Sequence, residues 1–117
     1  MIRNITLALL LATAAGVALA AQASGDAAKG KQIFTTQGCS YCHGTVGQGG
    51  GGRTGGLRLA NMGIAYPAFL EQLRHPRDEM PPYVESVLPD RDVADVFAYI
   101  ASLPAPPDAS TIPILNN

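Results

Sequence analysis

The stretch Cys39-Ser40-Tyr41-Cys42-His43 decides the fold of this chain. In such a C-x-x-C-H pattern, two thiols three positions apart bond the two vinyl groups of a haem, and the histidine that follows supplies an imidazole to the iron. The whole sequence holds two cysteines and two histidines, so this arrangement would arise by chance only about once in a few thousand sequences. The motif therefore predicts one covalent haem c, attached at Cys39 and Cys42 and ligated by His43.

Three other chemistries compete for the two cysteines. An exported protein permits a disulfide. A thioredoxin-like dithiol belongs to a βαβ context, and this sequence shows no alternation of strand period. A structural zinc site needs four ligands, and the one other histidine, His75, leaves the set incomplete. Haem attachment explains the spacing best.

The second axial ligand has three candidates, Met62, His75 and Met80. Met80 is favoured because a thioether suits haem iron in cytochromes, and because Pro81 and Pro82 leave the loop that presents it little conformational freedom to lose. His75 would give bis-histidine ligation and a lower reduction potential, and an open distal position is the third alternative. Met62 is assigned to packing.

The N-terminal residues have the pattern of an export signal. Arg3 precedes an uncharged apolar run over residues 5–20, and small residues fit A-x-A cleavage after Ala20 or Ala23. An uncleaved membrane anchor is the alternative, but the run is shorter than the roughly 20 apolar residues that a spanning helix needs. We therefore expect a signal peptide at 1–23 and a mature protein in the periplasm of a Gram-negative bacterium.

The mature chain predicts an all-α domain over residues 24–104, followed by a proline-rich tail over 105–117. Helices are expected over 26–34 with Asp26 as N-cap, over 67–74 beginning at Pro67, and over 89–103 beginning at Pro89. Residues 44–56 are too glycine-rich for regular structure. The apolar end of the tail, 112–115, is expected to lie extended over the body.

Composition indicates a small core. About 95 mature residues suffice for one domain, and the sequence has no tryptophan but 13 glycines and nine prolines. Domains this short usually need a prosthetic group, a metal or disulfides. Residues 27–77 carry six basic side chains against Glu71, whereas 78–117 carry seven acidic ones against Arg91. Such a charge dipole orients a protein toward a charged partner, and nothing supports nucleic-acid binding.

With these features in this order, the mature chain resembles class I c-type cytochromes. The resemblance rests on Gly30 and Phe34 in the first helix, the attachment motif, Met80 before two prolines, and Tyr99 in the last helix. It implies a cytochrome c fold, three to four short helices wrapped around one haem. It also implies that the first and last helices cross, with Gly30 and Phe34 against Phe97 and Tyr99.

The sequence departs from that family in one loop. Many relatives have Gly-Pro-x-Leu there, whereas residues 54–59 of this chain contain no proline. A ligating imidazole needs an acceptor for its second nitrogen, so a carbonyl among Gly55 to Leu57 is expected to serve. Near the ligand loop, Arg74, Arg77 and Tyr83 are candidates to bond the haem propionates, with Arg74 and Tyr83 favoured.

The resemblance implies an electron carrier rather than an enzyme. Its expected partners are redox proteins, an upstream dehydrogenase and a downstream oxidase or cytochrome. The tail motivates one alternative, the haem subunit of a periplasmic dehydrogenase complex. Another alternative is a haem enzyme or gas sensor with an open distal site, where His75 and Arg77 would supply the polar groups.

Overall fold

The computed structural model of the protein describes residues 24–50 and 55–116. Over these residues the chain forms four α-helices, α1 (Ala27–Thr36), α2 (Cys39–His43), α3 (Tyr66–Arg74) and α4 (Asp90–Ser102), and two short 3-10 helices, η1 (Ala109–Thr111) and η2 (Pro113–Leu115). The described part contains no strand, so the predicted all-α class is confirmed. The predicted signal peptide, residues 1–23, lies outside the described residues.

Asp26 begins α1 as the sequence predicts. Its carboxylate accepts hydrogen bonds from the backbone N–H groups of Ala28 and Lys29, at 2.8 and 3.1 Å, which satisfies two amides that have no partner inside the helix. The helix ends at Thr36 with Gln37 as its C-cap, and Gly38 follows with φ 82°. That left-handed conformation suits glycine, and it turns the chain directly into α2.

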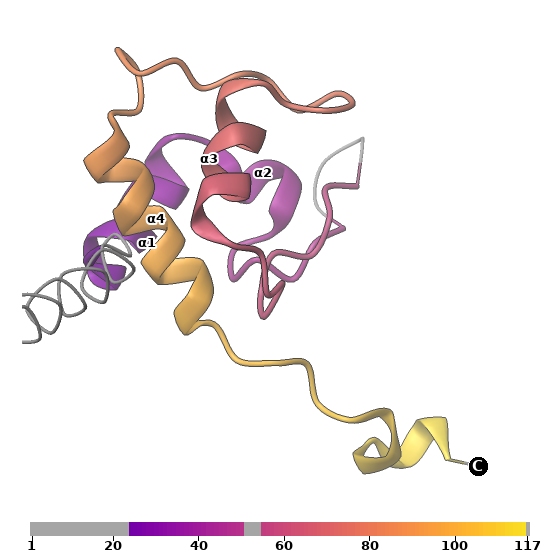
Figure 1. The fold of residues 1–117 in the computed structure, drawn as a ribbon. Coiled ribbons are helices and arrows are strands. Elements are labelled where there is room, and N and C mark those ends of the chain that lie inside the picture. Colours follow the sequence, from indigo (N-terminus) through magenta and orange to yellow (C-terminus); the bar gives the residue numbers. More distant parts are fainter. Residues whose placement is uncertain (1–23, 51–54, 117) are drawn as a thin grey trace, which may run out of the picture.

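Helices α1 and α4 cross in close contact (Figure 1). A Cβ atom at Gly30 would lie 1.9 Å from the Asp95 carbonyl oxygen, so only glycine lets the two backbones approach this far. Phe34 is fully buried, and its ring meets Tyr99 edge-on with centroids 5.5 Å apart. The expected crossing of the two helices and the contact between Phe34 and Tyr99 are thus confirmed, while Gly30 lies against the backbone of Asp95 and Val96 instead of an aromatic ring.

Phe97 differs from that expectation, because it faces α3 rather than α1. Its ring packs against Tyr66 and Phe69, with centroids 5.3 and 5.4 Å away. Phe97 and Tyr99 are two positions apart, and residues with that spacing lie on different faces of a helix. Helix α4 therefore packs against α1 with one face and α3 with another. The buried apolar cluster that results comprises Phe34, Phe69, Leu73, Leu88, Val93, Val96, Tyr99 and Ile100.

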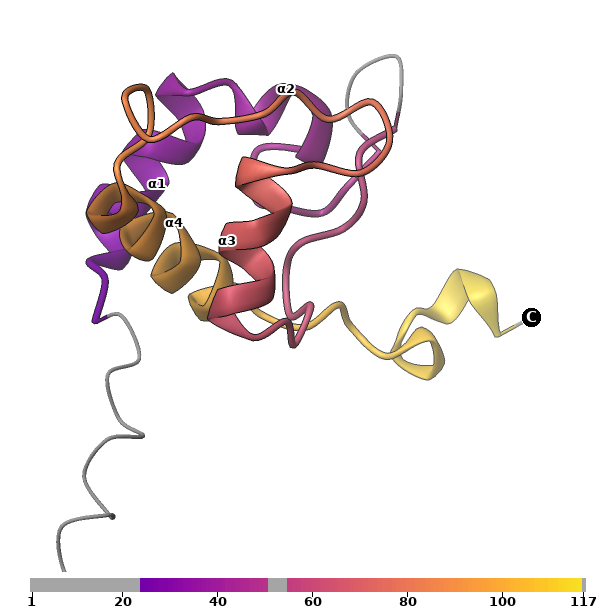
Figure 2. The same cartoon turned by 45° about the horizontal axis from the view of Figure 1, so that its top comes forward.

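Two loops complete the part of the fold that positions the site. Residues 76–88 run from the end of α3 across the molecule to α4 (Figure 2). In the glycine-rich loop, the two described parts are joined by backbone hydrogen bonds: Gly50 N–H donates to the Gly56 carbonyl at 2.9 Å, and Leu59 N–H to the Gly47 carbonyl at 2.8 Å. For the described residues of this loop, 44–50 and 55–56, the predicted absence of regular structure is confirmed, and the loop nevertheless has a defined pairing.

The prediction for the tail was wrong. Residues 104–116 run away from the helices (Figure 1), and η1 and η2 contact only each other among the elements. Ile114 and Leu115 are 79% and 62% exposed. The body has exposed apolar side chains of its own, among them Val46, Leu57 and Val87, but the tail does not cover them. Among the described residues, no helix is both long and apolar enough to cross a membrane.

Candidate functional site

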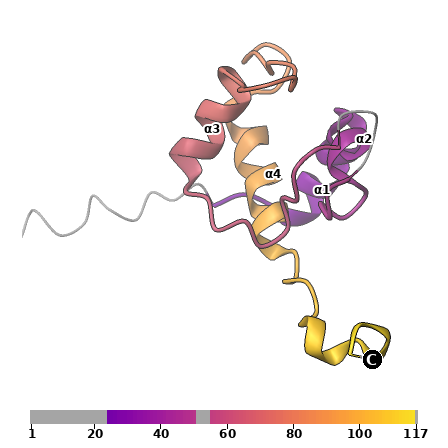
Figure 3. The same ribbon diagram turned by 90° about the vertical axis from the view of Figure 1, so that its right-hand side faces the viewer.

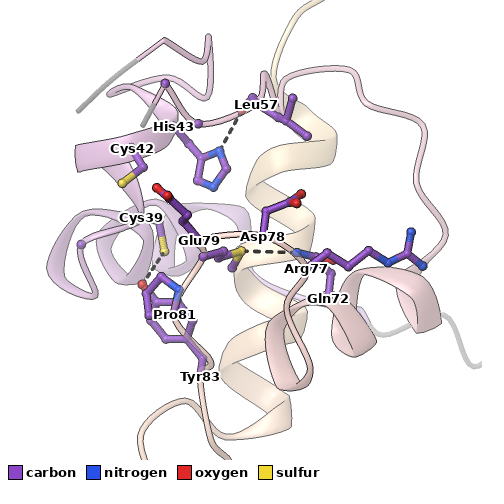
Figure 4. Close-up of a pocket in the computed structure, with 14 residues that line it drawn as sticks. Cys39, Cys42, His43, Leu57, Gln72, Arg77, Asp78, Glu79, Pro81 and Tyr83 are labelled. Atoms are coloured by element: carbon purple, nitrogen blue, oxygen red, sulfur yellow. Dashed lines mark hydrogen bonds between the residues drawn. The ribbon is translucent and has the colours of Figure 1, made fainter. Parts of the chain in front are cut away.

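The attachment motif forms its own short helix. Gly38, with φ 82°, precedes α2, and Gly44, with φ 79°, ends it. Cys39 and Cys42 are three positions apart and therefore project from the same side of the helix. Both cysteines are partly buried and carry free thiols. Desolvation by burial raises the pKa of Cys39 above its usual value. Figure 4 shows the two sulfur atoms with the His43 ring beside them.

The ring of His43 is held by one backbone acceptor. Its Nδ1 lies 2.8 Å from the Leu57 carbonyl oxygen, so Nδ1 carries the proton and donates it. The other nitrogen, Nε2, then has a lone pair available for a metal ion. The expectation of an acceptor among Gly55 to Leu57 is confirmed, and Leu57 provides it.

A cavity of about 720 Å³ opens beside the motif, and a second one of about 430 Å³ adjoins it. Figure 3 shows α2 and α3 apart from each other, and these two helices make no direct contact. Cavities of this size accept cofactors. Residues that line both cavities are Cys39, His43, Leu57, Gln72, Arg77, Asp78 and Met80.

The three candidates for the second ligand lie in different places. Met80 is half-buried and lines both cavities. Met62 lines the smaller cavity alone and is 42% exposed. His75 lines neither cavity; its side chain is 76% exposed, and its Nδ1 lies 3.1 Å from the Glu71 carboxylate. Of the three, Met80 is the one that shares both cavities with His43.

Tyr83 lines the larger cavity, as expected of a residue near the cofactor. Its hydroxyl donates a hydrogen bond to the Gln37 carbonyl at 2.9 Å and lies 4.0 Å from the sulfur of Cys39. Burial, and after it the neighbouring Cys39 thiol, raises the pKa of Tyr83 to about 12. The phenol is therefore neutral at physiological pH and joins the ligand loop to the end of α1.

Arg74 lies elsewhere than predicted. It lines neither cavity, and its guanidinium donates to the Tyr83 carbonyl and pairs with Asp90. Because it is the last residue of α3, its side chain reaches the start of α4 instead of the cavity. Arg74 thus supports the loop, while Arg77 is the arginine that lines both cavities.

The sequence reasoning missed Gln72. This residue lines both cavities, and its Nε2 donates to the sulfur of Met80 at 3.8 Å. The signal was its spacing: Gln72 follows the buried Phe69 by three positions and therefore lies on the same face of α3. A polar residue on an apolar helix face is informative, because a buried polar group needs a partner.

The residues around the cavity fit a haem c. Two free thiols project from one side of a short helix, an imidazole with an available Nε2 lies next to them, and a thioether lines the same space. The smaller cavity has a mostly apolar lining that includes Phe34, Phe69 and Ile100, which suits a large apolar macrocycle. The described residues contain no cluster of three or more histidine, cysteine or acidic side chains able to hold a bare metal ion.

Helices α1 and α4 crossing over an attachment helix, with this cavity beside it, define the chain as a small c-type cytochrome. Residues 25–100 match the family described as cytochrome c oxidase, cbb3-type, subunit III. The chain belongs to that family. The match begins at Gly25, just before α1, and ends inside α4. No curated protein and no solved structure matches the chain. Membership of this class implies haem c and a role in electron transfer.

Proposed function

We propose that the protein carries one electron at a time on a single haem c whose axial ligands are His43 and Met80. The observation that carries the proposal is that Met80 lines both cavities together with His43 and Cys39, and lines the larger one together with Cys42 as well. The sequence contains one C-x-x-C-H motif and no further cysteine, which supports a single haem. When bound, the haem supplies a reversible one-electron change at the iron.

The residues around the cavity would give the iron a fixed environment. Leu57 holds the imidazole of His43 in one tautomer through the 2.8 Å hydrogen bond, and Pro81 restricts the backbone next to Met80. With protein ligands on both sides, the iron would have no open position for substrate, so the protein would act as a carrier and not as an enzyme. Histidine and methionine together favour a comparatively high reduction potential.

We place this carrier in the periplasm of a Gram-negative bacterium. Support comes from the export pattern of residues 1–23 and from the requirement that haem c be attached outside the cytoplasm in members of this class. Redox proteins, a dehydrogenase upstream and an oxidase or cytochrome downstream, would dock transiently. The opposite charges of residues 27–77 and residues 78–117 would steer that encounter. Complementary charge between partners raises association rates more than affinity.

The visible spectrum of the purified protein tests the ligands. Iron–thioether ligation gives a weak absorption band at the red end of the spectrum of the oxidised protein. We expect this band in the wild type, its loss in Met80→Ala and its retention in His75→Ala, because His75 is exposed and paired with Glu71. A band that survives Met80→Ala, or prompt stoichiometric binding of carbon monoxide to the reduced wild type, would contradict the proposal.

A second candidate function rests on the tail. Asp108 caps η1 by accepting from the Ser110 N–H at 2.8 Å, and the Asn116 side chain donates to three carbonyls of the same segment. These bonds give the segment a shape of its own, from which Ile114 and Leu115 project. Such an element would anchor the cytochrome to a larger subunit of a periplasmic dehydrogenase complex.

A further inference from the structure

Helix α3 presents one polar side chain to the proposed ligand. The Nε2 of Gln72 lies 3.8 Å from the sulfur of Met80, within hydrogen-bond distance for sulfur, and Figure 4 marks this bond at Gln72. A thioether sulfur has lone pairs and no proton, so it can only accept. The NH₂ group of the amide, and not its oxygen, therefore faces Met80.

The position of Gln72 is fixed by its own helix. Phe69 and Leu73, at 7% and 4% exposure, are buried against the core on either side of it. Their packing sets the rotation of α3 about its axis. With that rotation, the half-buried Gln72 projects into both cavities, where an amide without a partner would be costly.

The position of Met80 relative to α3 is fixed as well. After the ligand, the chain returns to the helix: the Tyr83 N–H donates to the Leu73 carbonyl at 2.8 Å, and the Arg74 guanidinium donates to the Tyr83 carbonyl. Three consecutive residues of α3 thus hold the ligand loop. Gln72 bonds to the sulfur of Met80, while Leu73, through its carbonyl, and Arg74, through its side chain, bond to the backbone of Tyr83. This construction brings the amide and the sulfur together independently of their own weak bond.

We propose that Gln72 is a positioning residue that raises the reduction potential of the haem through Met80; this inference rests on the proposed ligation by Met80. A thioether sulfur has one lone pair for the iron and another for the amide. The positive end of the N–H dipole withdraws electron density from the sulfur, so the sulfur donates less density to the iron. This loss destabilises the oxidised iron, which carries one more positive charge, more than it destabilises the reduced iron. The reduced state is therefore favoured relative to the oxidised state, and the reduction potential rises.

The experiment compares midpoint potentials of the holoprotein at pH 7 in the wild type and in Gln72→Leu, which keeps bulk and removes the donor. A net hydrogen bond changes an equilibrium about two- to tenfold, which at 59 mV per tenfold change for one electron corresponds to about 20 to 60 mV. We expect the variant to be lower by that amount and to retain the thioether band. Gln32→Leu, the same change at an exposed position of α1, should leave the potential unchanged.

A second variant separates tuning from packing. Gln72→Glu keeps the shape of the side chain but places an ionised acceptor near the sulfur, so its potential should fall below that of Gln72→Leu. An unchanged or raised potential in Gln72→Leu overturns the inference, and so does loss of the thioether band from both variants, which would make Gln72 a purely structural support. If the band is missing from the wild type itself, the ligation proposal fails first, and the two failures are distinguishable.

Discussion

At Gly56 the loop passes close to the attachment helix. A Cβ atom there would lie 2.5 Å from the Cys42 carbonyl oxygen and 3.1 Å from Nδ1 of His43. The absence of a side chain lets the next residue, Leu57, bring its carbonyl to the imidazole. Where similar cytochromes have a proline in this loop, the present chain combines a glycine with the backbone bond from Gly50 to the Gly56 carbonyl.

Gly56→Ala should therefore displace the loop and weaken the hydrogen bond to His43. Forcing a methyl group into a filled space costs about 1–3 kcal/mol, and we expect a loss of that size in the free energy of unfolding of the holoprotein, measured with guanidinium. Gly50→Ala is the control: its added methyl meets no atom of the described residues within 4 Å, and its φ of 74° alone costs about 1 kcal/mol. An equal or smaller loss at Gly56 would contradict the steric argument.

Single residues differ in how far the sequence predicts them. Cys39, Cys42 and His43 follow from covalent geometry, because the spacing of the haem vinyl groups and the iron dictates the motif. Arg74 and Gln72 do not follow, since both lie near the end of α3 and only the rotation of that helix against α4 decides which one faces the cavity. That rotation depends on Phe69 and Leu73 packing, which is a tertiary effect.

At the scale of elements, one carboxylate joins α1 to α4. Asp95 is 8% exposed. Its carboxylate accepts a hydrogen bond from the Asp26 N–H at 2.7 Å and forms an ion pair with Lys29 at 2.8 Å. The bond from Lys29, and next that from Asp26, lowers the pKa of Asp95 below 3.8. The start of α1 is thereby held against the middle of α4, where Gly30 makes the crossing close.

This lowered pKa predicts an acid-dependent loss of stability. A carboxyl group whose pKa is lower in the folded state stabilises the fold above its unfolded pKa, and that contribution disappears as the pH falls through the folded value. The free energy of unfolding should thus decrease below about pH 4. Asp95→Asn should be less stable at pH 7 and show a shallower decrease between pH 5 and pH 2, measured by denaturant unfolding at each pH. Parallel curves for the variant and the wild type would contradict this role.

The elements themselves follow from local chemistry more than from packing. Asp26, Pro67 and Pro89 mark helix starts at which the structure begins α1, α3 and α4 within one residue. The tail could not be predicted in this way. Apolar residues at 112–115 indicate a contact, but the sequence does not state whether that contact is made with the body of this chain or with another molecule.

For the whole molecule, the tail is separable from the domain. Because η1 and η2 contact no helix, a chain ending at Pro104 should keep the haem spectrum and should lose less than about 0.5 kcal/mol of unfolding free energy. If the tail anchors a larger subunit, the same truncation should abolish co-elution with that subunit from periplasmic extracts. A truncated protein that loses more than about 1 kcal/mol would mean that the tail packs on the body after all.

The cavity separates α2 from α3, and each of these helices is held by a different neighbour. Helices α2 and α3 make no contact with each other, and the space between them is the cavity of about 720 Å³. Contacts with α4 hold α3, and contacts with α1 hold α2. A bound haem would connect these two halves by touching both sides at once, in a domain whose core contains eight buried cluster residues.

Without haem, the chain should therefore lose cooperative tertiary structure. The double variant Cys39→Ala, Cys42→Ala, expressed without attached haem, should retain part of its helical far-ultraviolet circular dichroism, because α1 and α4 contact each other directly. Its near-ultraviolet signal and its sharp thermal transition should be absent, as in other compact states without fixed packing. The holoprotein is the reference. A cooperative transition in the haem-free variant would mean that the eight-residue cluster suffices to fold the domain, and that the haem enters a structure already formed.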